Sequence, residues 1–363
     1  MSERNVLQIL PRAPGTFDGV GDYALALARG LRDKHGIDSV FVARETQGRN
    51  EVESFLIFPL QEFSRARASK ETCDGVILHY VNYGFQKRGV PVTLVSFLRS
   101  LRHDCGGARL VIFHELYASG PPWRSEFWLR PLQKKIARDL ARLADARFVS
   151  CESMGEQLEK LSGEENVIVQ PVVSTWGEPA LNQSQLRERD PRCWIISGGT
   201  ALIERSLRSF LKIVKQLPPE IAPRKLLLVG GEPNPHLRAL LNIPAPFTAE
   251  YFPAISPDDA APHFSAAAFA WIDYFDSRAV PADVLLKSST FVSLCAHGVI
   301  SVTPGISGPI AIKGDTLPVP FSLGKMPTSS ERADAAVETY RWYHRHASAA
   351  SLHKAVAQQL QLA

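Results

Sequence analysis

The sequence has few cysteines and no long apolar run, and each absence narrows the class of protein. Its five cysteines form no C-x-x-C pair, which argues against a disulfide scaffold or a zinc site and predicts reduced thiols. No run approaches the roughly 18 apolar residues that a membrane-spanning helix needs. The first residues lead into a strand-like stretch without an apolar signal segment. We therefore expect a cytoplasmic protein and leave open a peripheral contact with the inner membrane face.

Several functional signatures are absent as well. Lys and Arg number 41 against 37 Asp and Glu and are spread along the chain, whereas nucleic-acid-binding proteins usually concentrate them. We therefore expect no nucleic-acid partner. Neither a metal-ligand spacing nor a serine nucleophile elbow is present, so we expect no metal and no cofactor. The dinucleotide signature G-x-G-x-x-G is missing because Ala24 stands at its third glycine, which disfavours an oxidoreductase.

What the chain does have is a regular alternation of strand-like and helix-like segments. Apolar runs predict strands at residues 6–10, 39–43, 55–58, 75–79, 109–113, 147–150 and 167–169. After a stretch with prolines and charges, the alternation restarts with strands at 193–197, 225–229, 269–273 and 299–302, and a helix is predicted at 284–296. Such alternation is typical of a parallel sheet with helices on both faces.

We predict two Rossmann-like, doubly wound α/β domains that face each other across a cleft. The predicted parts are an N-terminal domain at 1–172, a linker at 173–191, a C-terminal domain at 192–345, and a terminal helix at 346–363 that returns to brace the N-terminal domain. Ligands of open α/β sheets bind at the carboxyl ends of the strands. Candidate site residues are therefore those that follow the predicted strands.

The first candidate is the glycine turn formed by Gly19, Val20 and Gly21, which precedes a predicted helix. Glycines let the backbone approach an anion closely, and the helix start offers free amide groups and the positive end of the dipole. A diphosphate could sit over this turn. An ordinary strand-to-helix turn with Asp18 as its N-cap is an equal alternative.

Polar residues follow two further strands of the first half. His114 and Glu115 come directly after the strand at 109–113, where a histidine can act beside a reacting group. The alternative is a His–Glu pair that tethers the loop. His79, Asn82 and Tyr83 lie at and after the strand at 75–79. They suit recognition of a sugar or an acceptor, or they pack the loop.

The candidates of the second half share small or cationic side chains at strand exits and helix starts. An arginine at such a place can hold a diphosphate bidentately, and a surface ion pair is its alternative. A plain turn is the alternative for the glycines, and an ordinary helix start is the alternative for the serine pair. The candidates are Gly199, Thr200 and Arg205, then Gly230, Gly231 and Glu232, and then Lys287, Ser288 and Ser289.

In their order these segments resemble the retaining GT-B glycosyltransferases. The likeness rests on residues 18–23, 76–80, 111–115 and 286–302 and spans nearly the whole chain. It implies transfer of a sugar, with retention and without a metal, from a nucleotide-diphosphate sugar to a glycan, lipid-linked or small-molecule acceptor.

The resemblance also implies roles for the parts of the chain. The N-terminal domain is the acceptor side, and the C-terminal domain binds the nucleotide sugar. Gly19 and Gly21 approach the donor phosphates, His114 lies beside the transferred sugar, and Arg205 replaces a phosphate-binding lysine.

The chain departs from the family pattern at three positions. Thr200 stands where a second cation is usual, and Leu285 and Ser293 stand where the family has two glutamates. The second of these glutamates grips the ribose, so we expect either a substitute grip at 287–289 or lost activity. Two alternatives stay open: a GT-B-fold protein that binds a nucleotide sugar or a partner without transfer, and a sugar-nucleotide epimerase.

Overall fold

The chain folds into two compact units. In the computed structural model, unit 1 comprises Met1–Pro171 together with Ala349–Ala363, and unit 2 comprises Val172–Ser348. The structure describes residues 4–15, 19–63, 73–104, 106–118, 123–241, 245–275, 280–305 and 308–361. The predicted N-cap Asp18 lies outside the described residues.

Unit 1 is built on an eight-stranded sheet in the order β3-β4-β2-β1-β5-β6-β7-β8. Its strands pair in parallel except for β3 and β4, which are antiparallel. The strands are β1 (Arg4–Arg12), β2 (Ile37–Glu45), β3 (Glu51–Val52), β4 (Phe55–Pro59), β5 (Gly75–Tyr80), β6 (Ala108–Phe113), β7 (Ala146–Val149) and β8 (Val167–Val169). Because β5, β6 and β7 are buried along their whole length, their sequences are nearly continuous apolar runs.

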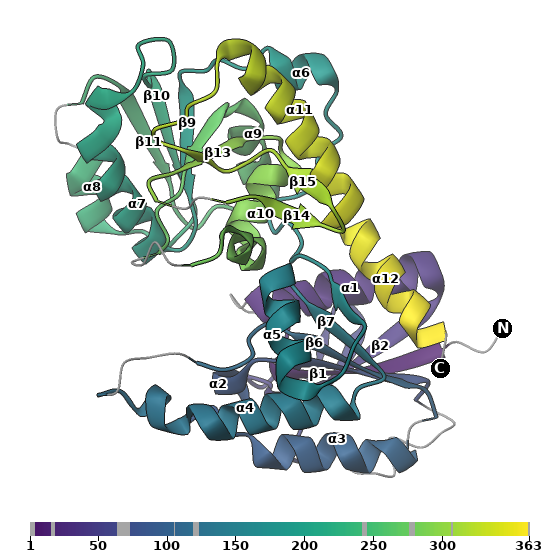
Figure 1. Cartoon of the computed structure of the whole chain (residues 1–363). Coiled ribbons are helices and arrows are strands. Elements are labelled where there is room, and N and C mark those ends of the chain that lie inside the picture. Colours follow the sequence, from purple (N-terminus) through teal and green to yellow (C-terminus); the bar gives the residue numbers. More distant parts are fainter. Residues whose placement is uncertain are drawn as a thin grey trace. The chain divides into compact units, whose positions relative to one another are not determined.

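Helices cover both faces of this sheet, with α3 and α4 on one face and α1 with α12 on the other (Figure 1). Tyr23, Leu27 and Leu31, spaced by four residues, are buried in α1, so one stripe of the helix faces the core. A Cβ on Gly30 of α1 would overlap the ring of His353 in α12, so glycine permits their close approach. The helices are α1 (Gly19–His35), α2 (Asn82–Phe85), α3 (Val92–Asp104), α4 (Ser125–Leu143), α5 (Glu152–Ser162) and α12 (Ala349–Gln361).

Unit 2 is built on a parallel six-stranded sheet in the order β11-β10-β9-β12-β13-β16, with a separate antiparallel pair, β14 and β15. Its core stacks Trp194 on Phe269 with ring centroids 4.8 Å apart. The strands are β9 (Cys193–Ser197), β10 (Lys225–Val229), β11 (Thr248–Phe252), β12 (Phe269–Trp271), β13 (Ile300–Thr303), β14 (Ile310–Ile312), β15 (Asp315–Leu317) and β16 (Phe321–Ser322).

The helices of unit 2 begin with recognisable capping residues. Thr328 and Glu331 form a capping box at the start of α11, and Ser256 caps α9. The α-helices are α6 (Gln183–Arg187), α7 (Thr200–Ile213), α8 (Pro235–Leu241), α9 (Pro257–Ala266), α10 (Ser289–Ala296) and α11 (Ser329–His346), and the 3₁₀ helices are η2 (Val214–Gln216) and η3 (Ala282–Lys287). Within the described part of the chain, no helix is long and apolar enough to cross a membrane.

Each parallel sheet reverses its strand order at one point. In unit 1 the order runs outward through β1, β2 and β4 on one side and through β5, β6 and β7 on the other. In unit 2 the corresponding reversal lies between β9 and β12. Doubly wound sheets bind ligands at the carboxyl ends of the strands beside this reversal. The topology therefore directs attention to the turns after β1 and β5 and after β9 and β12.

The predicted α/β class with two doubly wound sheets is confirmed, and several short or edge strands, among them β3, β11 and β14, were not predicted. β11 is an additional strand whose residues are partly or fully exposed at the sheet edge, so it lacks the apolar run that marks a buried strand. The helix predicted at 284–296 is divided, because η3 ends at Lys287 and Ser288 caps α10. The segment predicted as a linker, 173–191, lies within unit 2 and contains α6.

Candidate functional site

The three residues predicted to form a glycine turn before a helix, Gly19, Val20 and Gly21, are the first residues of helix α1 itself. Helix α1 begins at Gly19, and a Cβ built on Gly19 would meet no atom within 4 Å. Packing therefore does not require glycine here, and the space beside the backbone can admit a ligand. Val20 is partly exposed and Gly21 is buried. Because the first amide groups of a helix lack intrahelical carbonyl partners, this end of α1 suits an anion.

His79 and His114 come together at the carboxyl ends of β5 and β6. The Nδ1 atom of His79 lies 3.3 Å from Nε2 of His114, and Tyr23 of α1 contacts both rings edge-on. Burial lowers the pKa of His79 well below its usual value, and the neighbouring His114 lowers it further, so His79 is neutral at pH 7. His114 is partly exposed, and the following Glu115 is exposed.

Two buried polar residues that were not predicted extend this pair across the sheet. The Nε2 atom of His79 lies 2.9 Å from Oε1 of Gln8, and the side-chain amide of Gln8 donates to the hydroxyl of Ser39 at 3.0 Å. Gln8 is 0% exposed and Ser39 is 1% exposed. The sequence signal that could have found Gln8 is its polar side chain inside the apolar run at 6–10, since a buried polar group needs a partner.

The three residues predicted to contact an acceptor differ in exposure. His79 is 0% exposed, Asn82 is 1% exposed and Tyr83 is 37% exposed. Asn82 donates to the buried side chain of Gln133 at 3.3 Å, and Gln133 donates to the Tyr83 hydroxyl at 3.2 Å. The side chains of His79 and Asn82 therefore support the loop from inside unit 1, and Tyr83 alone of the three reaches solvent.

Two glycine turns of unit 2 touch each other at the carboxyl ends of β9 and β10. A Cβ on Gly230, whose φ is +105°, would lie 2.7 Å from the carbonyl oxygen of Gly198. A Cβ on Gly231 would lie 2.8 Å from Oγ1 of Thr200. The Thr200 hydroxyl in turn accepts a hydrogen bond of 2.8 Å from the backbone amide of Glu232. Close backbone approach thus accounts for these glycines, and Thr200 ties the two turns together.

Helix α7 starts beside these turns and carries Arg205. Gly199 is its N-cap residue, and a Cβ there would meet no atom within 4 Å. The guanidinium of Arg205 lies 3.8 Å from the carboxylate of Asp273, which follows β12. The next residue, Tyr274, donates its hydroxyl to the carbonyl of Ser197 at 3.1 Å. Asp273 and Tyr274 were not predicted as site residues, although their place after β12, at the reversal of strand order, is the signal that identifies them.

The three predicted residues of the η3–α10 junction have different environments. The Ser288 hydroxyl accepts from the backbone amide of Phe291 at 3.3 Å and so caps α10. The Ser289 carbonyl accepts from the hydroxyl of Ser293 at 2.7 Å. These contacts match the ordinary helix start that was the alternative for the serine pair. Lys287, at the end of η3, is partly exposed.

Two glutamate positions of the glycosyltransferases that this chain resembles are fully buried here. Leu285 and Ser293 are both 0% exposed. The Ser293 hydroxyl accepts from the hydroxyl of Ser174 at 3.0 Å and from the backbone amide of Thr175 at 3.1 Å. A glutamate at position 293 would have to displace this segment. In this chain the position is a packing contact inside unit 2.

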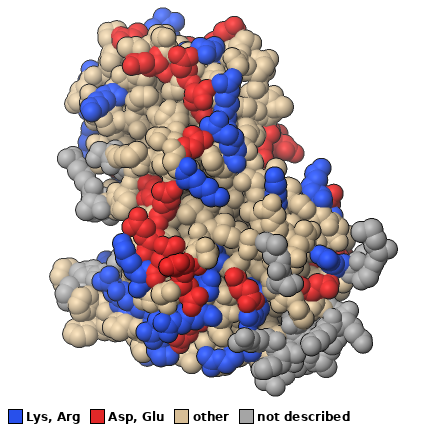
Figure 2. Space-filling model, turned by 45° about the vertical axis from the view of Figure 1, so that its right-hand side comes forward, with Lys and Arg blue, Asp and Glu red and all other residues tan. Residues whose placement is uncertain are grey.

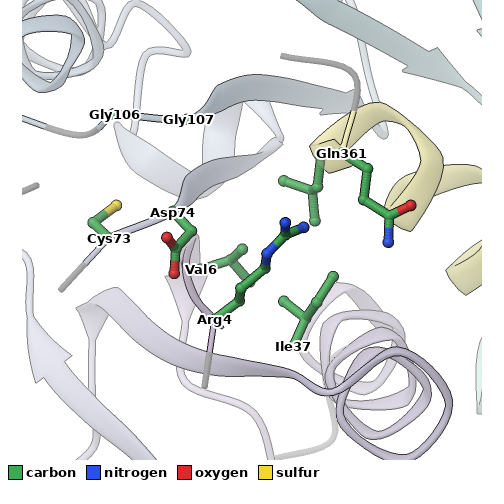
Figure 3. A pocket seen from close by; sticks show the side chains of 9 residues that line it. Arg4, Val6, Ile37, Cys73, Asp74, Gly106, Gly107 and Gln361 are labelled. Carbon is green, nitrogen blue, oxygen red and sulfur yellow. The ribbon is translucent and has the colours of Figure 1, made fainter. Parts of the chain in front are cut away.

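A cavity of about 260 Å³ in unit 1 lies away from these residues. Arg4, Asp74 and Gln361 are among its lining residues, and Figure 3 shows their side chains around it. Because β1 begins at Arg4 and β5 begins at Gly75, this cavity is at the amino edge of the sheet, opposite to the glycine turn and the histidines. Among the residues that the structure describes, no group of three or more His, Cys, Asp or Glu could hold a metal ion.

Solved structures match the chain over its full length. An alpha-glucosyltransferase in complex with UDP and a 13-mer DNA containing an HMU base is 13% identical, with 99% of this chain and 100% of that chain covered and a TM-score of 0.59. An alpha-glucosyltransferase with UDP-glucose and DNA containing an abasic site is 13% identical, with 99% of each chain covered and a TM-score of 0.58. MurG of Acinetobacter baumannii is 16% identical, with 99% and 100% covered and a TM-score of 0.54.

At these identities the likeness establishes the fold, and the chain has the GT-B fold. No family model matches the chain, and neither does any curated protein sequence.

These structures correct the expectation that nucleic acid is no partner. That expectation rested on the spread of cations along the chain, and the face in Figure 2 does show Lys and Arg mixed with Asp and Glu. Yet alpha-glucosyltransferases of this fold are in complex with DNA. The exclusion was wrong because phosphate contacts can come from several separate segments that a fold brings together. Dispersed cations in a sequence therefore do not exclude nucleic acid.

Proposed function

We propose that this chain transfers a sugar from a nucleotide-diphosphate sugar to an acceptor. The observation that carries the proposal is the kind of segment that follows the strands beside the two reversals of strand order. In each parallel sheet, the first strand beside the reversal is followed by a glycine-bearing turn and a helix start. Such turns bring backbone amides and a helix dipole to a diphosphate. The GT-B fold, seen over the full length in structures that hold UDP, supports the same function.

In this proposal unit 2 holds the nucleotide diphosphate. The turns at Gly199 and at 230–232 border the nucleotide, and Arg205 and Lys287 supply positive charge to the phosphates. A guanidinium matches phosphate oxygens with two parallel hydrogen bonds. The Arg205 side chain is 32% exposed and 3.8 Å from Asp273, so it can exchange this long ion pair for a phosphate. That exchange would leave Asp273 and Tyr274 beside the bound donor.

Within unit 1, we assign the amino-terminal turn of α1 to binding of donor phosphates and His114 to contact with the transferred sugar. As the bond between the sugar and the phosphate breaks, negative charge grows on the leaving diphosphate. Fixed amides and cations aimed at that charge are the main source of rate enhancement in this proposal. We also propose that the acceptor attacks from the face the diphosphate leaves, which retains the anomeric configuration. NMR of the product tests this point alone, because an inverted product would contradict retention and leave transfer intact.

Calorimetry with nucleotide diphosphates tests donor binding. We expect Arg205→Ala to weaken UDP or GDP binding about tenfold, since a hydrogen bond to a charged group contributes about 1.5–3 kcal/mol. Arg208→Ala is the matched control, because Arg208 lies one turn along α7 and pairs with Glu204 at 2.7 Å. Equal affinities for both variants and the unchanged chain would contradict the assigned phosphate site. A panel of nucleotide sugars then identifies the donor by hydrolysis and transfer.

We propose DNA as the first acceptor to test. Residues 123–142, which include most of α4, carry six Lys or Arg against two Asp or Glu. Trp123 is 83% exposed and Trp128 is 71% exposed. Cations that follow a phosphate backbone, with exposed aromatic rings that stack on bases, are the usual means of binding single-stranded nucleic acid. The fold itself is found in complex with DNA in the alpha-glucosyltransferases.

The acceptor assay measures binding and labelled-sugar transfer to DNA with and without an HMU base. We expect Trp128→Ala to weaken DNA binding about tenfold, because stacking contributes about 1–3 kcal/mol per base. Leu56→Ala is the matched control, since Leu56 is 49% exposed on β4. Absence of both binding and transfer would remove DNA as the acceptor without affecting the nucleotide experiment.

A GT-B-fold protein that binds a nucleotide sugar without transferring it is the second candidate function. The observation that favours it is the burial of Leu285 and Ser293 at the family's glutamate positions. A donor that binds tightly and is neither hydrolysed nor transferred would establish this alternative. Slow hydrolysis of the same donor would establish the transferase.

A further inference from the structure

A row of polar side chains crosses one face of the unit 1 sheet. The register of β2, β1, β5 and β6 puts Ser39, Gln8, His79 and His114 on the same face, each on or directly after a different strand. Three of the four are at most 1% exposed. Apolar side chains would fill these buried positions at lower cost, because burying a polar group is unfavourable unless it is hydrogen-bonded. The row is therefore a candidate for a role beyond packing.

The hydrogen bonds of this row have a fixed direction. The NH₂ group of Gln8 donates to Ser39, so the carbonyl oxygen of Gln8 faces His79 at 2.9 Å. A carbonyl oxygen only accepts, and the Nε2 atom of His79 must therefore carry a proton. Burial disfavours the cationic ring, which leaves Nδ1 of His79 as an acceptor. Its neighbour at 3.3 Å, Nε2 of His114, must then donate.

We propose that Gln8 and His79 are positioning residues that hold His114 with a proton on Nε2. In the neutral ring of His114 the basic nitrogen is then Nδ1. This nitrogen accepts a hydrogen bond from a hydroxyl of the bound sugar. The inference rests on the proposed function, in which His114 lies beside the transferred sugar. Tyr23, which packs edge-on against both rings, keeps the two imidazoles in this arrangement.

The opposite tautomer would give His114 a different chemistry. With the proton on Nδ1, a neutral His114 would donate to the sugar and could not accept from it. Ser39, at the far end of the row, supports this arrangement, because its hydroxyl accepts from the amide of Gln8 and leaves the carbonyl oxygen of Gln8 toward His79. Loss of the Ser39 hydroxyl would therefore remove the partner of that amide.

NMR of the full chain with ¹⁵N-labelled histidine tests the proposal directly. At pH 8 we expect His114 to carry its proton on Nε2, with signals assigned by loss in His114→Gln. In Gln8→Met, which removes the acceptor, we expect a mixture of both tautomers. Gln8→Glu, which restores an acceptor toward His79, should return the Nε2 form. Gln133→Met, at another buried glutamine of unit 1, should leave the His114 tautomer unchanged.

Kinetics supply a second measurement. We expect Gln8→Met to lower kcat about tenfold to a hundredfold, the scale known for outer hydrogen-bond partners of metal-binding histidines, with little change in KM for the donor. If Gln8→Met does not fold, Ser39→Ala serves instead, because it releases the amide of Gln8 to rotate. A His114 proton on Nδ1 in the unchanged chain, or one tautomer in all variants, would overturn the proposal. The NMR result stands apart from activity, so a missing transferase activity would be recognised separately as failure of the proposed function.

Discussion

Six strands of unit 1, from β4 to β7 across the sheet, follow the same order as the six strands of unit 2, but different groups connect the strand ends in the two sheets. In unit 1 Tyr23 near the start of α1 packs against a row of side chains in which Gln8, His79 and His114 are hydrogen-bonded. In unit 2 two glycine turns pack backbone against backbone, and Thr200 joins them. Side chains in a row can fix a protonation state, whereas packed turns fix the position of amide groups. One sheet topology thus supports two kinds of ligand contact.

The largest expected effect is a loss of stability at acidic pH, and it comes from a feature that the two units share. Each buries a histidine whose pKa is lowered by burial, His79 in unit 1 and His297 in unit 2, the latter from 6.5 to about 4. Between these values the unfolded chain binds more protons than the folded chain. The contribution of these histidines to the free energy of unfolding is therefore fully present above pH 6.5 and is lost as the pH falls toward 4. For His297 the difference corresponds to about 3 kcal/mol.

Urea unfolding between pH 7 and pH 4 measures this loss. We expect His297→Gln to flatten the pH dependence, because glutamine does not titrate. His236→Gln, at a side chain that is 69% exposed, is the control and should keep the original slope. A slope that His297→Gln leaves unchanged would assign the acid sensitivity to other groups.

The next effect tests whether the turns of unit 2 depend on backbone packing. We expect Gly230→Ala to lower the free energy of unfolding by about 2–3 kcal/mol, since φ is +105° and the new Cβ would lie 2.7 Å from the carbonyl oxygen of Gly198. Nucleotide binding should weaken as well, because the neighbouring turn must move. Gly177→Ala, with φ at +85° and open space around the Cβ, should cost about 1 kcal/mol and leave nucleotide binding intact. Equal costs for the two variants would contradict the packing explanation.

The smallest expected effect distinguishes two roles for Ser288, that of a helix cap and that of a phosphate contact. We expect Ser288→Ala to lower the free energy of unfolding by about 1 kcal/mol, because its hydroxyl caps α10. Nucleotide affinity should change less than in Lys287→Ala, since the Ser288 hydroxyl accepts from the amide of Phe291 and carries no positive charge. Thr328→Ala, which removes the cap of α11, is the control for the loss of stability. A large loss of affinity in Ser288→Ala would make Ser288 a phosphate ligand after all.

The fold follows from local patterns to a large extent. Buried parallel strands such as β6 are continuous apolar runs, and their alternation with helices specifies two doubly wound sheets. Edge strands such as β11 carry no such mark, because their side chains are partly or fully exposed. The division of the helix at Ser288 was also hidden, since a serine inside an apolar helix and a serine that caps one differ only in tertiary context.

The candidate site was predictable only in part. Residues at strand ends could be listed because parallel strands end at a common edge. The sequence does not tell which of them point inward, and His79 and Asn82 are both buried. Gln8 meets Ser39 and His79 across separations of 31 and 71 residues, and no local spacing encodes such pairs. A buried polar residue in an apolar strand indicates that a partner exists without naming it.

Helix α12 belongs to unit 1 but follows unit 2 in the sequence, so unit 1 is complete only after unit 2 has been synthesised. Every residue of unit 2 is synthesised between Pro171 and Ala349. Until α12 emerges, its contact with α1 around Gly30 cannot form, whereas unit 2 is one continuous stretch of the sequence. Unit 1, which begins before unit 2 in the sequence, is therefore completed after it.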